Sequence, residues 1–254
     1  MTPWLNLENF CVFIEGQPFV QNIHVSLSGN SSLAIFGPTG SGKSLLLKGL
    51  MGLQPVCGGL NILNTPPTLQ QNKGALPNLS PLYDQIGFAF QQNGLFDFCT
   101  VEENLTLGHM LRSSSDTSAP SSHAQQQPEK TTHEYAQDIL KHLGLWEHRH
   151  KQPSQLSGGQ KKRLSIARAL TKRPRILITD DPLAGLDPVS SNIVLDLLVD
   201  AVQTFKVGLI ASISSSAITQ NRFTHCLVLH QGKQLFFDTS EQFQEHWPEL
   251  SKQF

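Results

Sequence analysis

Residues 37–44 read Gly37-Pro38-Thr39-Gly40-Ser41-Gly42-Lys43-Ser44, the G-x-x-x-x-G-K-S pattern of a phosphate-binding loop. Glycines let the backbone turn tightly and bring several N–H groups onto one anionic phosphate chain. Lys43 can then reach the β- and γ-phosphates of a nucleotide, and the Ser44 hydroxyl can ligate Mg²⁺. The pattern alone leaves kinases, GTPases and ATPases open.

The sequence on both sides gives this loop the context that it requires. Residues 31–36 form a short apolar run typical of a buried strand, and residues 45–51 continue as a helix. Further short apolar runs alternate with helical patterns along the chain, which predicts a mostly parallel α/β sheet. The expected strands are 86–90, 175–179 and 207–211, the expected helices are 131–143 and 193–202, and β structure is expected at 4–36, with a hairpin at 225–237.

Composition narrows the class of protein. The chain has 254 residues, 39% of them hydrophobic, and a formal net charge of −1, which is typical of a globular protein and not of a disordered or strongly basic one. It has no apolar run near the ~18 residues of a membrane span and no signal peptide, so we expect a soluble protein. Its cysteines form no C-x-x-C motif and are expected to be reduced packing or surface thiols of a cytosolic protein: Cys11, Cys57, Cys99 and Cys226.

A second motif, Leu156-Ser157-Gly158-Gly159-Gln160, precedes a basic helix expected over 161–172. Together with the phosphate loop it resembles the signature of ABC transporter ATPases, and the resemblance spans about residues 5–240. It implies an α/β P-loop NTPase of ABC type, with a mostly parallel sheet core, an N-terminal antiparallel β subdomain and an inserted α-helical subdomain. We expect a single domain over 1–254, divided into a core at 1–90 and 165–240, a helical subdomain at 91–164 with a flexible insertion at 112–128, and a C-terminal tail at 241–254.

The resemblance also assigns roles to individual residues. It implies ATP and Mg²⁺ as cofactors, with the loop residues Gly37 to Ser44 binding ATP and Mg²⁺ held by Ser44, Gln91 and, through water, Asp180. Gln91 and Asp181 take catalytic positions, and Asp187 lies in the D-loop. In a head-to-tail dimer, the signature residues would contact the ATP bound by the other subunit: Ser157, Gly158, Gly159 and Gln160.

Two catalytic positions depart from the family pattern. Asp181 stands where the family has Glu, and Ile213 stands at the position of the switch His, where it cannot hydrogen-bond the γ-phosphate. We expect normal ATP binding but hydrolysis slower by about 10²-fold or more, because both roles act on the attacking water and the γ-phosphate. Alternatively, Asp181 suffices and a nearby serine takes part of the His role. The aromatic that stacks on adenine aligns with Phe13 or Ile14, and the sequence does not decide between them.

The segment from Phe90 to Leu105 indicates the transporter class. It is similar to the Mla/MCE-type ATPases of phospholipid trafficking, as is the run 151–159. The resemblance implies a transmembrane permease docked in a groove around Gln91–Val101, on the cytoplasmic face of the inner membrane. A second ATPase subunit is expected, in a homodimer or in a heterodimer with a competent partner. Importers of amino acids, metals or other solutes share most of these features and remain an alternative.

Other functions are disfavoured. A basic stretch could bind nucleic acid, but it lacks interleaved aromatics and the whole chain is near neutral. It comprises Lys161, Lys162, Arg163, Arg168, Lys172, Arg173 and Arg175. Asp180 and Asp181 could be read as paired hydrolase carboxylates, but neighbours on one strand point to opposite faces.

Overall fold

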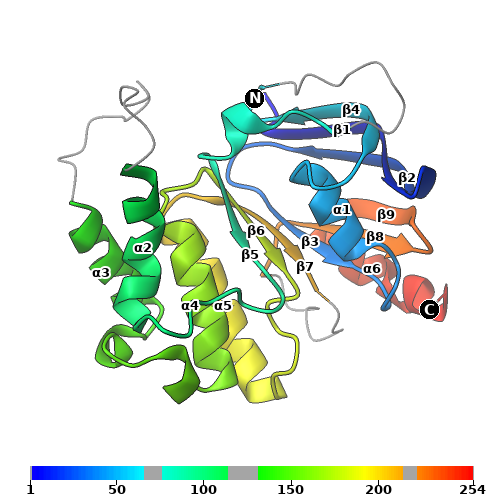
Figure 1. Cartoon of the computed structure of the whole chain (residues 1–254). Helices are drawn as coiled ribbons and strands as arrows, with labels where there is room; N and C mark the ends of the chain where they lie inside the picture. The colour runs from blue at the N-terminus through cyan, green and yellow to red at the C-terminus, as the bar shows by residue number, and fades with distance from the viewer. Residues whose placement is uncertain (1, 66–75, 114–130, 214–221, 254) are drawn as a thin grey trace.

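The computed structural model describes residues 2–65, 76–113, 131–213 and 222–253 (Figure 1). In this part of the chain nine strands form one sheet in the order β4-β1-β2-β9-β8-β3-β7-β6-β5. Their bounds are β1 Leu5–Ile14, β2 Gln17–Leu27, β3 Ser32–Phe36, β4 Val56–Ile62, β5 Ile86–Ala89, β6 Ile176–Asp180, β7 Gly208–Ser212, β8 His225–His230 and β9 Lys233–Thr239.

The sheet has a parallel half and an antiparallel half. Strands β8, β3, β7, β6 and β5 pair in parallel, whereas β1 pairs antiparallel with both β2 and β4. The halves join through β9, which is antiparallel to β8 and makes a single parallel pairing with β2 at Gln21 and Lys233. The predicted fold class, a mostly parallel α/β core with an N-terminal antiparallel region, is confirmed.

Helices cover both faces of the sheet (Figure 1). On β3, Leu33 and Ile35 join the apolar core beneath α1, while Ala34 and Phe36 join the core beneath α4 and α5, because successive strand residues point to opposite faces. The helices are α1 Lys43–Leu50, α2 Val101–Ser113, α3 Thr132–His142, α4 Gly158–Leu170, α5 Pro188–Thr204 and α6 Ser240–Leu250, with 3₁₀ turns at Ser80–Leu82, Trp146–His148, Pro153–Gln155 and Ser251–Gln253.

The helix starts follow from their caps. Ser157 accepts a hydrogen bond from the Gln160 N–H in a capping box, so α4 begins inside the signature motif, before the expected residue 161. Asp187 accepts hydrogen bonds from two backbone N–H groups and Pro188 follows it, so α5 begins five residues before the expected residue 193.

Two helices were not expected from the sequence. Residues 101–113 form α2, which includes the first two residues of the insertion expected at 112–128; the rest of that insertion lies outside the described residues. The expected tail at 241–254 contains α6, whose Phe243 is buried and stacks on Phe36 with ring centroids 5.0 Å apart. The division into a core and a helical subdomain stays a prediction.

No helix within the described ranges is long and apolar enough to cross a membrane.

Candidate nucleotide-binding site

The predicted site residues of the phosphate loop and of the three strands beside it lie at one edge of the sheet. The phosphate loop follows β3, Ile213 follows β7, Asp181 follows β6 and Gln91 follows β5. These four strands are neighbours in the order β3-β7-β6-β5 and run parallel. The crevice outside the carboxyl ends of parallel strands is where α/β sheets bind ligands.

The backbone of the phosphate loop needs glycine at particular positions. Gly37 has φ 148°, and a Cβ there would lie 2.1 Å from the carbonyl oxygen of Leu229. Gly42, just before α1, has φ 104°, and a Cβ there would lie 2.9 Å from Cγ2 of Val20. Side chains are therefore excluded at both positions, which keeps the loop backbone open to a phosphate.

Lys43 is the cation of this loop. Its Nζ donates hydrogen bonds to the carbonyl oxygens of Gly37 at 2.7 Å and Pro38 at 2.9 Å. Burial lowers the pKa of Lys43, and the charges of Asp181 and Asp180 act in the opposite direction. The loop thus holds a buried ammonium group beside backbone N–H groups, an arrangement suited to an anionic ligand.

Asp180 connects the ends of β6 and β7 to the start of α1. Its Oδ1 accepts a hydrogen bond from Ser44 Oγ at 2.8 Å and another from Ser212 Oγ at 2.7 Å. Ser212 Oγ in turn accepts from the Asp181 N–H at 2.9 Å. A hydroxyl and a carboxylate in contact are the hard oxygen ligands that Mg²⁺ prefers, so Ser44 and Asp180 fit this ion. From the sequence, Ser212 stood out only as a hydroxyl next to the switch position, and its bond to Asp180 was not predicted.

Asp181 lies just beyond β6, which ends at Asp180. It adopts φ 44°, in the left-handed region. The argument that Asp180 and Asp181 point to opposite faces of one strand is therefore wrong for this pair, since the strand has ended before the second residue.

Ile213 is completely buried and belongs to the apolar core on the α4 side of the sheet. Its N–H donates to the carbonyl oxygen of Ile35 at 2.9 Å. The position predicted for the switch His is therefore occupied by an aliphatic side chain that packs in the core. The serines at 214–216 lie outside the described residues, and the hydroxyl of Ser212 is already bonded to Asp180.

The loop containing Gln91 is held by α4. Lys162 Nζ donates to the Gln91 carbonyl oxygen at 2.6 Å, and Ser165 Oγ donates to that of Asn93 at 2.9 Å. Arg168 donates to the Gly94 carbonyl oxygen. Burial lowers the pKa of Lys162, while the charges of Asp181 and Asp180 oppose that effect. The Gln91 side chain itself is exposed, which leaves its predicted Mg²⁺ contact as a prediction.

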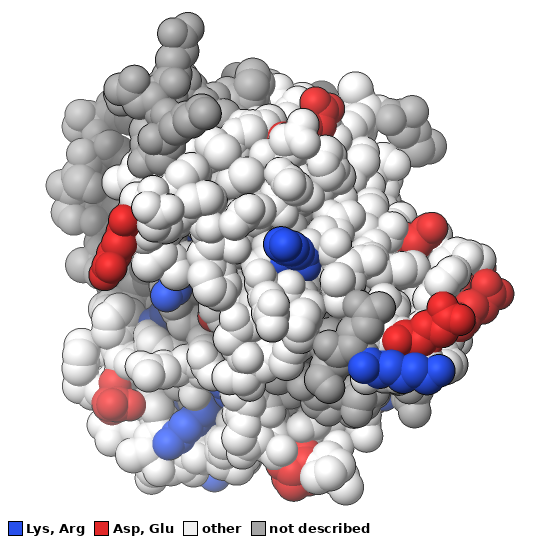
Figure 2. Space-filling view, turned by 90° about the vertical axis from the view of Figure 1, so that its right-hand side faces the viewer, with Lys and Arg blue, Asp and Glu red and all other residues white. Residues whose placement is uncertain are grey.

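Part of the basic stretch thus binds carbonyl groups inside the protein. Besides Lys162 and Arg168, Arg163 donates to the Leu143 carbonyl oxygen at 2.8 Å. Figure 2 shows the side of the molecule that lies on the right of Figure 1. On the described part of this face, basic and acidic side chains are scattered among mostly uncharged residues. The bonds to carbonyl groups give Lys162, Arg163 and Arg168 of α4 a structural role.

The signature segment lies against the D-loop of the same chain. A Cβ on Gly158 would lie 3.3 Å from Cδ2 of Leu186, one residue before Asp187. Ser157 and Gly158 are exposed at the start of α4. Hydrogen bonds from Ser190, through its side chain and its backbone N–H, hold the pKa of Asp187 below its usual value.

The aromatic ring beside the phosphate loop belongs to neither expected residue. Phe13 is buried and Ile14 is an exposed aliphatic residue. Phe19, on β2, is 40% exposed, and its Cε1 lies 3.4 Å from where a Cβ on Gly42 would be. Phe19 was not named from the sequence, and the assignment of the adenine contact to Phe13 or Ile14 stays a prediction.

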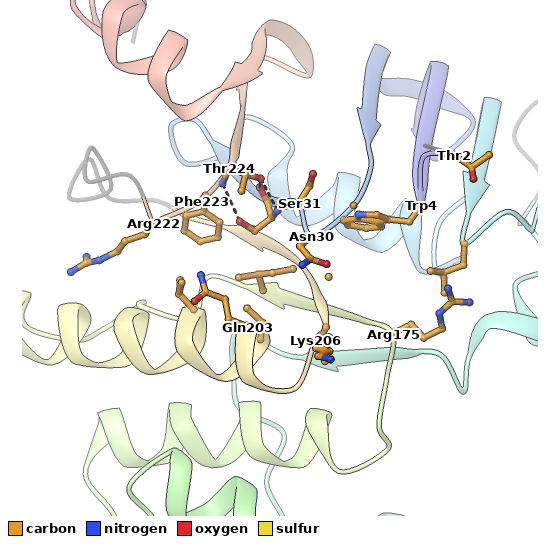
Figure 3. A pocket seen from close by; sticks show the side chains of 18 of the residues that line it. Thr2, Trp4, Asn30, Ser31, Arg175, Gln203, Lys206, Arg222, Phe223 and Thr224 are labelled. Atoms are coloured by element: carbon orange, nitrogen blue, oxygen red, sulfur yellow. Dashed lines mark hydrogen bonds between the residues drawn. The ribbon is translucent and has the colours of Figure 1, made fainter. Parts of the chain in front are cut away.

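A cavity of about 480 Å³ lies at the other ends of the strands (Figure 3). It is lined by residues at the amino ends of β3, β6, β7 and β8, with Trp4, Asn30 and Gln203 around it. Arg222, at its rim, pairs with Asp196 at 2.8 Å. The cavity is separate from the edge that carries the phosphate loop.

A family model for ABC transporters matches residues 20–184. The chain belongs to the ABC transporter family. It is 30% identical over 233 residues to "Phosphonates import ATP-binding protein PhnC 1" of Nostoc sp., covering 91% of this chain and 85% of that one. It is 33% identical over 186 residues to "Arginine transport ATP-binding protein ArtM" of Bacillus subtilis, covering 73% and 70%.

A solved structure supports the fold. CbiO1 of Clostridium perfringens, described as part of the ABC transporter complex cbiONQ, superposes with a TM-score of 0.80 at 22% identity, over 99% of this chain and 94% of that one. The family model and the fold together identify an ATPase domain of ABC type.

Proposed function

We propose that this chain is the ATP-binding and ATP-hydrolysing subunit of an ABC importer of a small solute. The observation that carries the proposal is the contact of Ser44 Oγ with Asp180 Oδ1, 2.8 Å apart, beneath a glycine loop that carries a buried lysine. When bound, Mg²⁺ would supply the charge that neutralises the β- and γ-phosphates. Ser44 and Asp180 would hold the ion, Lys43 would bind phosphate oxygens, and Phe19 would offer a ring to the base.

The two relatives named above favour solute import. Their names refer to phosphonates and to arginine, which are small polar molecules. They lend no support to the phospholipid trafficking that the sequence suggested from residues 90–105 and 151–159. A solute importer, the alternative left open by the sequence, is therefore the better proposal.

A second candidate is a subunit that binds ATP with little turnover and completes the site of a competent ATPase partner. It is favoured by Asp181 and by the buried Ile213, next to a signature segment with its sequence intact. Exposed Ser157 and Gly158 could meet the ATP of a second subunit in either a homodimer or a heterodimer. Both candidates place the protein at the cytoplasmic face of the membrane, bound to a permease.

We expect the purified chain to bind ATP saturably and more tightly with Mg²⁺ than with EDTA, since Ser44 and Asp180 are placed to hold the ion. Titration with a fluorescent ATP analogue, competed by unlabelled ATP, measures both affinities. Turnover by the same preparation separates the two candidates, because the importer hydrolyses ATP and the low-turnover subunit does not. Absence of saturable ATP binding would contradict both.

We place the permease groove beside the Gln91 loop. A second cavity of about 470 Å³ is lined by Tyr83, Phe88, Phe90 and Phe96, among others. Phe90 and Phe98 are 48% and 75% exposed, which is unusual for such large apolar side chains. Arg168 lies over the Phe96 ring at 5.4 Å and donates to the Gly94 carbonyl oxygen, so α4 holds this surface in place.

We expect Phe98→Glu to weaken association with the membrane partner by about tenfold or more, because an exposed aromatic anchor would become a charge in an apolar contact. Co-purification of the tagged chain with a co-expressed permease subunit measures the effect. Val189→Glu is the matched control, since Val189 is an apolar residue 69% exposed on α5, outside the groove. Equal losses of association in Phe98→Glu and Val189→Glu would contradict docking of the permease beside the Gln91 loop.

A further inference from the structure

Two cysteines far apart in the sequence face each other across neighbouring strands. Cys11 of β1 is the register partner of Cys57 of β4, a pairing that was not predicted from the sequence. β4 is the edge strand of the described sheet, next to β1 (Figure 1). The pair therefore lies where small molecules in solution can approach it.

The direction of the two thiols follows from their neighbours. Val12 and Val56, the next register pair, are buried in the core beneath α1. Strand residues alternate between faces, so Cys11 and Cys57 point to the opposite face, and both are half-buried. Directly opposed residues of an antiparallel pair share one face, which brings the two sulfur atoms to the same side.

The spacing suits a disulfide. The Phe13 N–H donates to the Pro55 carbonyl oxygen at 2.9 Å, which is one of the two bonds of a hydrogen-bonded pair in the register of Val12 with Val56; proline has no N–H to make the other. Cys11 and Cys57 lie two positions further along, where an antiparallel ladder again forms a hydrogen-bonded pair with Cα atoms about 5.5 Å apart. Disulfides span Cα distances of about 4.4–6.8 Å, so little backbone movement is needed.

We propose that Cys11 and Cys57 form a dithiol–disulfide modification site, oxidised by a low-molecular-weight disulfide. One cysteine thiolate attacks the reagent, breaks its S–S bond and releases one small thiol, leaving a mixed disulfide. The second thiolate then attacks the protein sulfur of that mixed disulfide and releases the second small thiol. The protein loses two protons and two electrons, and the reagent gains them as two thiols.

The other two cysteines are unsuited to this chemistry. Cys99 and Cys226 are buried, and burial raises the pKa of Cys226 to about 11. A buried, protonated thiol reacts slowly with disulfides because the thiolate is the nucleophile. Oxidation is therefore directed to the pair on β1 and β4.

The cross-link would enclose the phosphate loop. Residues 12–56 lie between the two cysteines and include β2, β3 and α1. Closing this loop restricts the unfolded chain, and we expect the thermal midpoint to rise by about 5–10 °C. ATP affinity should change less than twofold, because the sulfur atoms face away from α1.

Oxidised glutathione, added to the purified full chain under native conditions, tests the site. After alkylation and digestion, mass spectrometry should find the Cys11 peptide joined to the Cys57 peptide. The thermal midpoint of the protein should rise, and a reducing agent should reverse the rise. Cys11→Ser and Cys57→Ser should each abolish both signals and leave only a mixed disulfide. Cys226→Ala is the matched control, which keeps the pair and should keep both signals.

Separate mixed disulfides on Cys11 and Cys57, without a cross-link, would overturn the proposal. So would a cross-link that joins two protein molecules or that involves Cys99 or Cys226. Because the readout does not depend on nucleotide, failure here leaves the proposed function untouched.

Discussion

Asp180→Asn is expected to remove the Mg²⁺ dependence of ATP binding and to lower turnover by about 10²–10³-fold, since an ion clamp contributes several kcal/mol. The carboxylate supplies the negative charge beside the Ser44 hydroxyl, and the amide is nearly the same size. Its carbonyl can still accept from Ser44 and Ser212, so the contacts that join β6, β7 and the start of α1 should survive. The loss should therefore reflect the missing charge and not an altered fold.

Titration of the ATP analogue with Mg²⁺ and with EDTA measures the effect. In Asp180→Asn the two affinities should coincide, and the affinity in EDTA should match that of the wild type. Ser212→Ala is the graded comparison, because it removes one hydrogen bond to Asp180 but keeps the charge. We expect its affinity for the ATP analogue in Mg²⁺ to fall by about tenfold at most. An Asp180→Asn variant that keeps full Mg²⁺-dependent affinity would show that the ion is held elsewhere.

Local signals were sufficient to predict the parallel part of the fold. The apolar run 31–36, the glycine loop and the helical run after it specify a strand, a turn and a helix from neighbouring residues alone. The link between the two halves of the sheet could not be predicted from the sequence. It rests on one parallel pairing of β2 with β9, between Gln21 and Lys233, which no periodicity within either segment encodes.

The same distinction holds for the site. Ser44 and Asp180 were named from their motifs, and the structure brings them into contact. The bond of Ser212 to Asp180 was not predicted because this serine carries no motif, and the contact arises only from what folding places beside it. Pairing of Cys11 with Cys57 likewise depends on a register between strands separated by the whole phosphate loop.

α6 shows how a tertiary contact can decide a local structure. The sequence at 241–254 was expected to be a tail, and it contains Pro248 within the helix that forms. Thr239 caps the helix, and Phe243 stacks on Phe36 at the end of β3. Burial of that aromatic against the core stabilises a helix that intrinsic propensity alone would not predict.

Asp181→Glu is expected to raise ATP turnover by about 10–10²-fold, because general-base catalysis depends on reach and the glutamate carboxylate extends one methylene further. Asp181 begins from a left-handed backbone at the end of β6, held by its N–H bond to Ser212. That bond belongs to the backbone, so the substitution should leave it intact. Phosphate release under saturating ATP and Mg²⁺, with and without the membrane partner, gives the comparison.

Ile213→His is the matched test of the other position that departs from the family pattern, the switch His. We expect this substitution to raise ATP turnover little. The Ile213 side chain is completely buried among apolar residues, where an imidazole would lose its hydrogen bonds to water at a cost of about 1–3 kcal/mol. Its thermal midpoint should fall while turnover stays near that of the parent protein. A large gain from Ile213→His would mean that this side chain can leave the core and reach the nucleotide. Equal turnover in wild type and Asp181→Glu, at a rate typical of transport ATPases, would instead mean that the aspartate suffices.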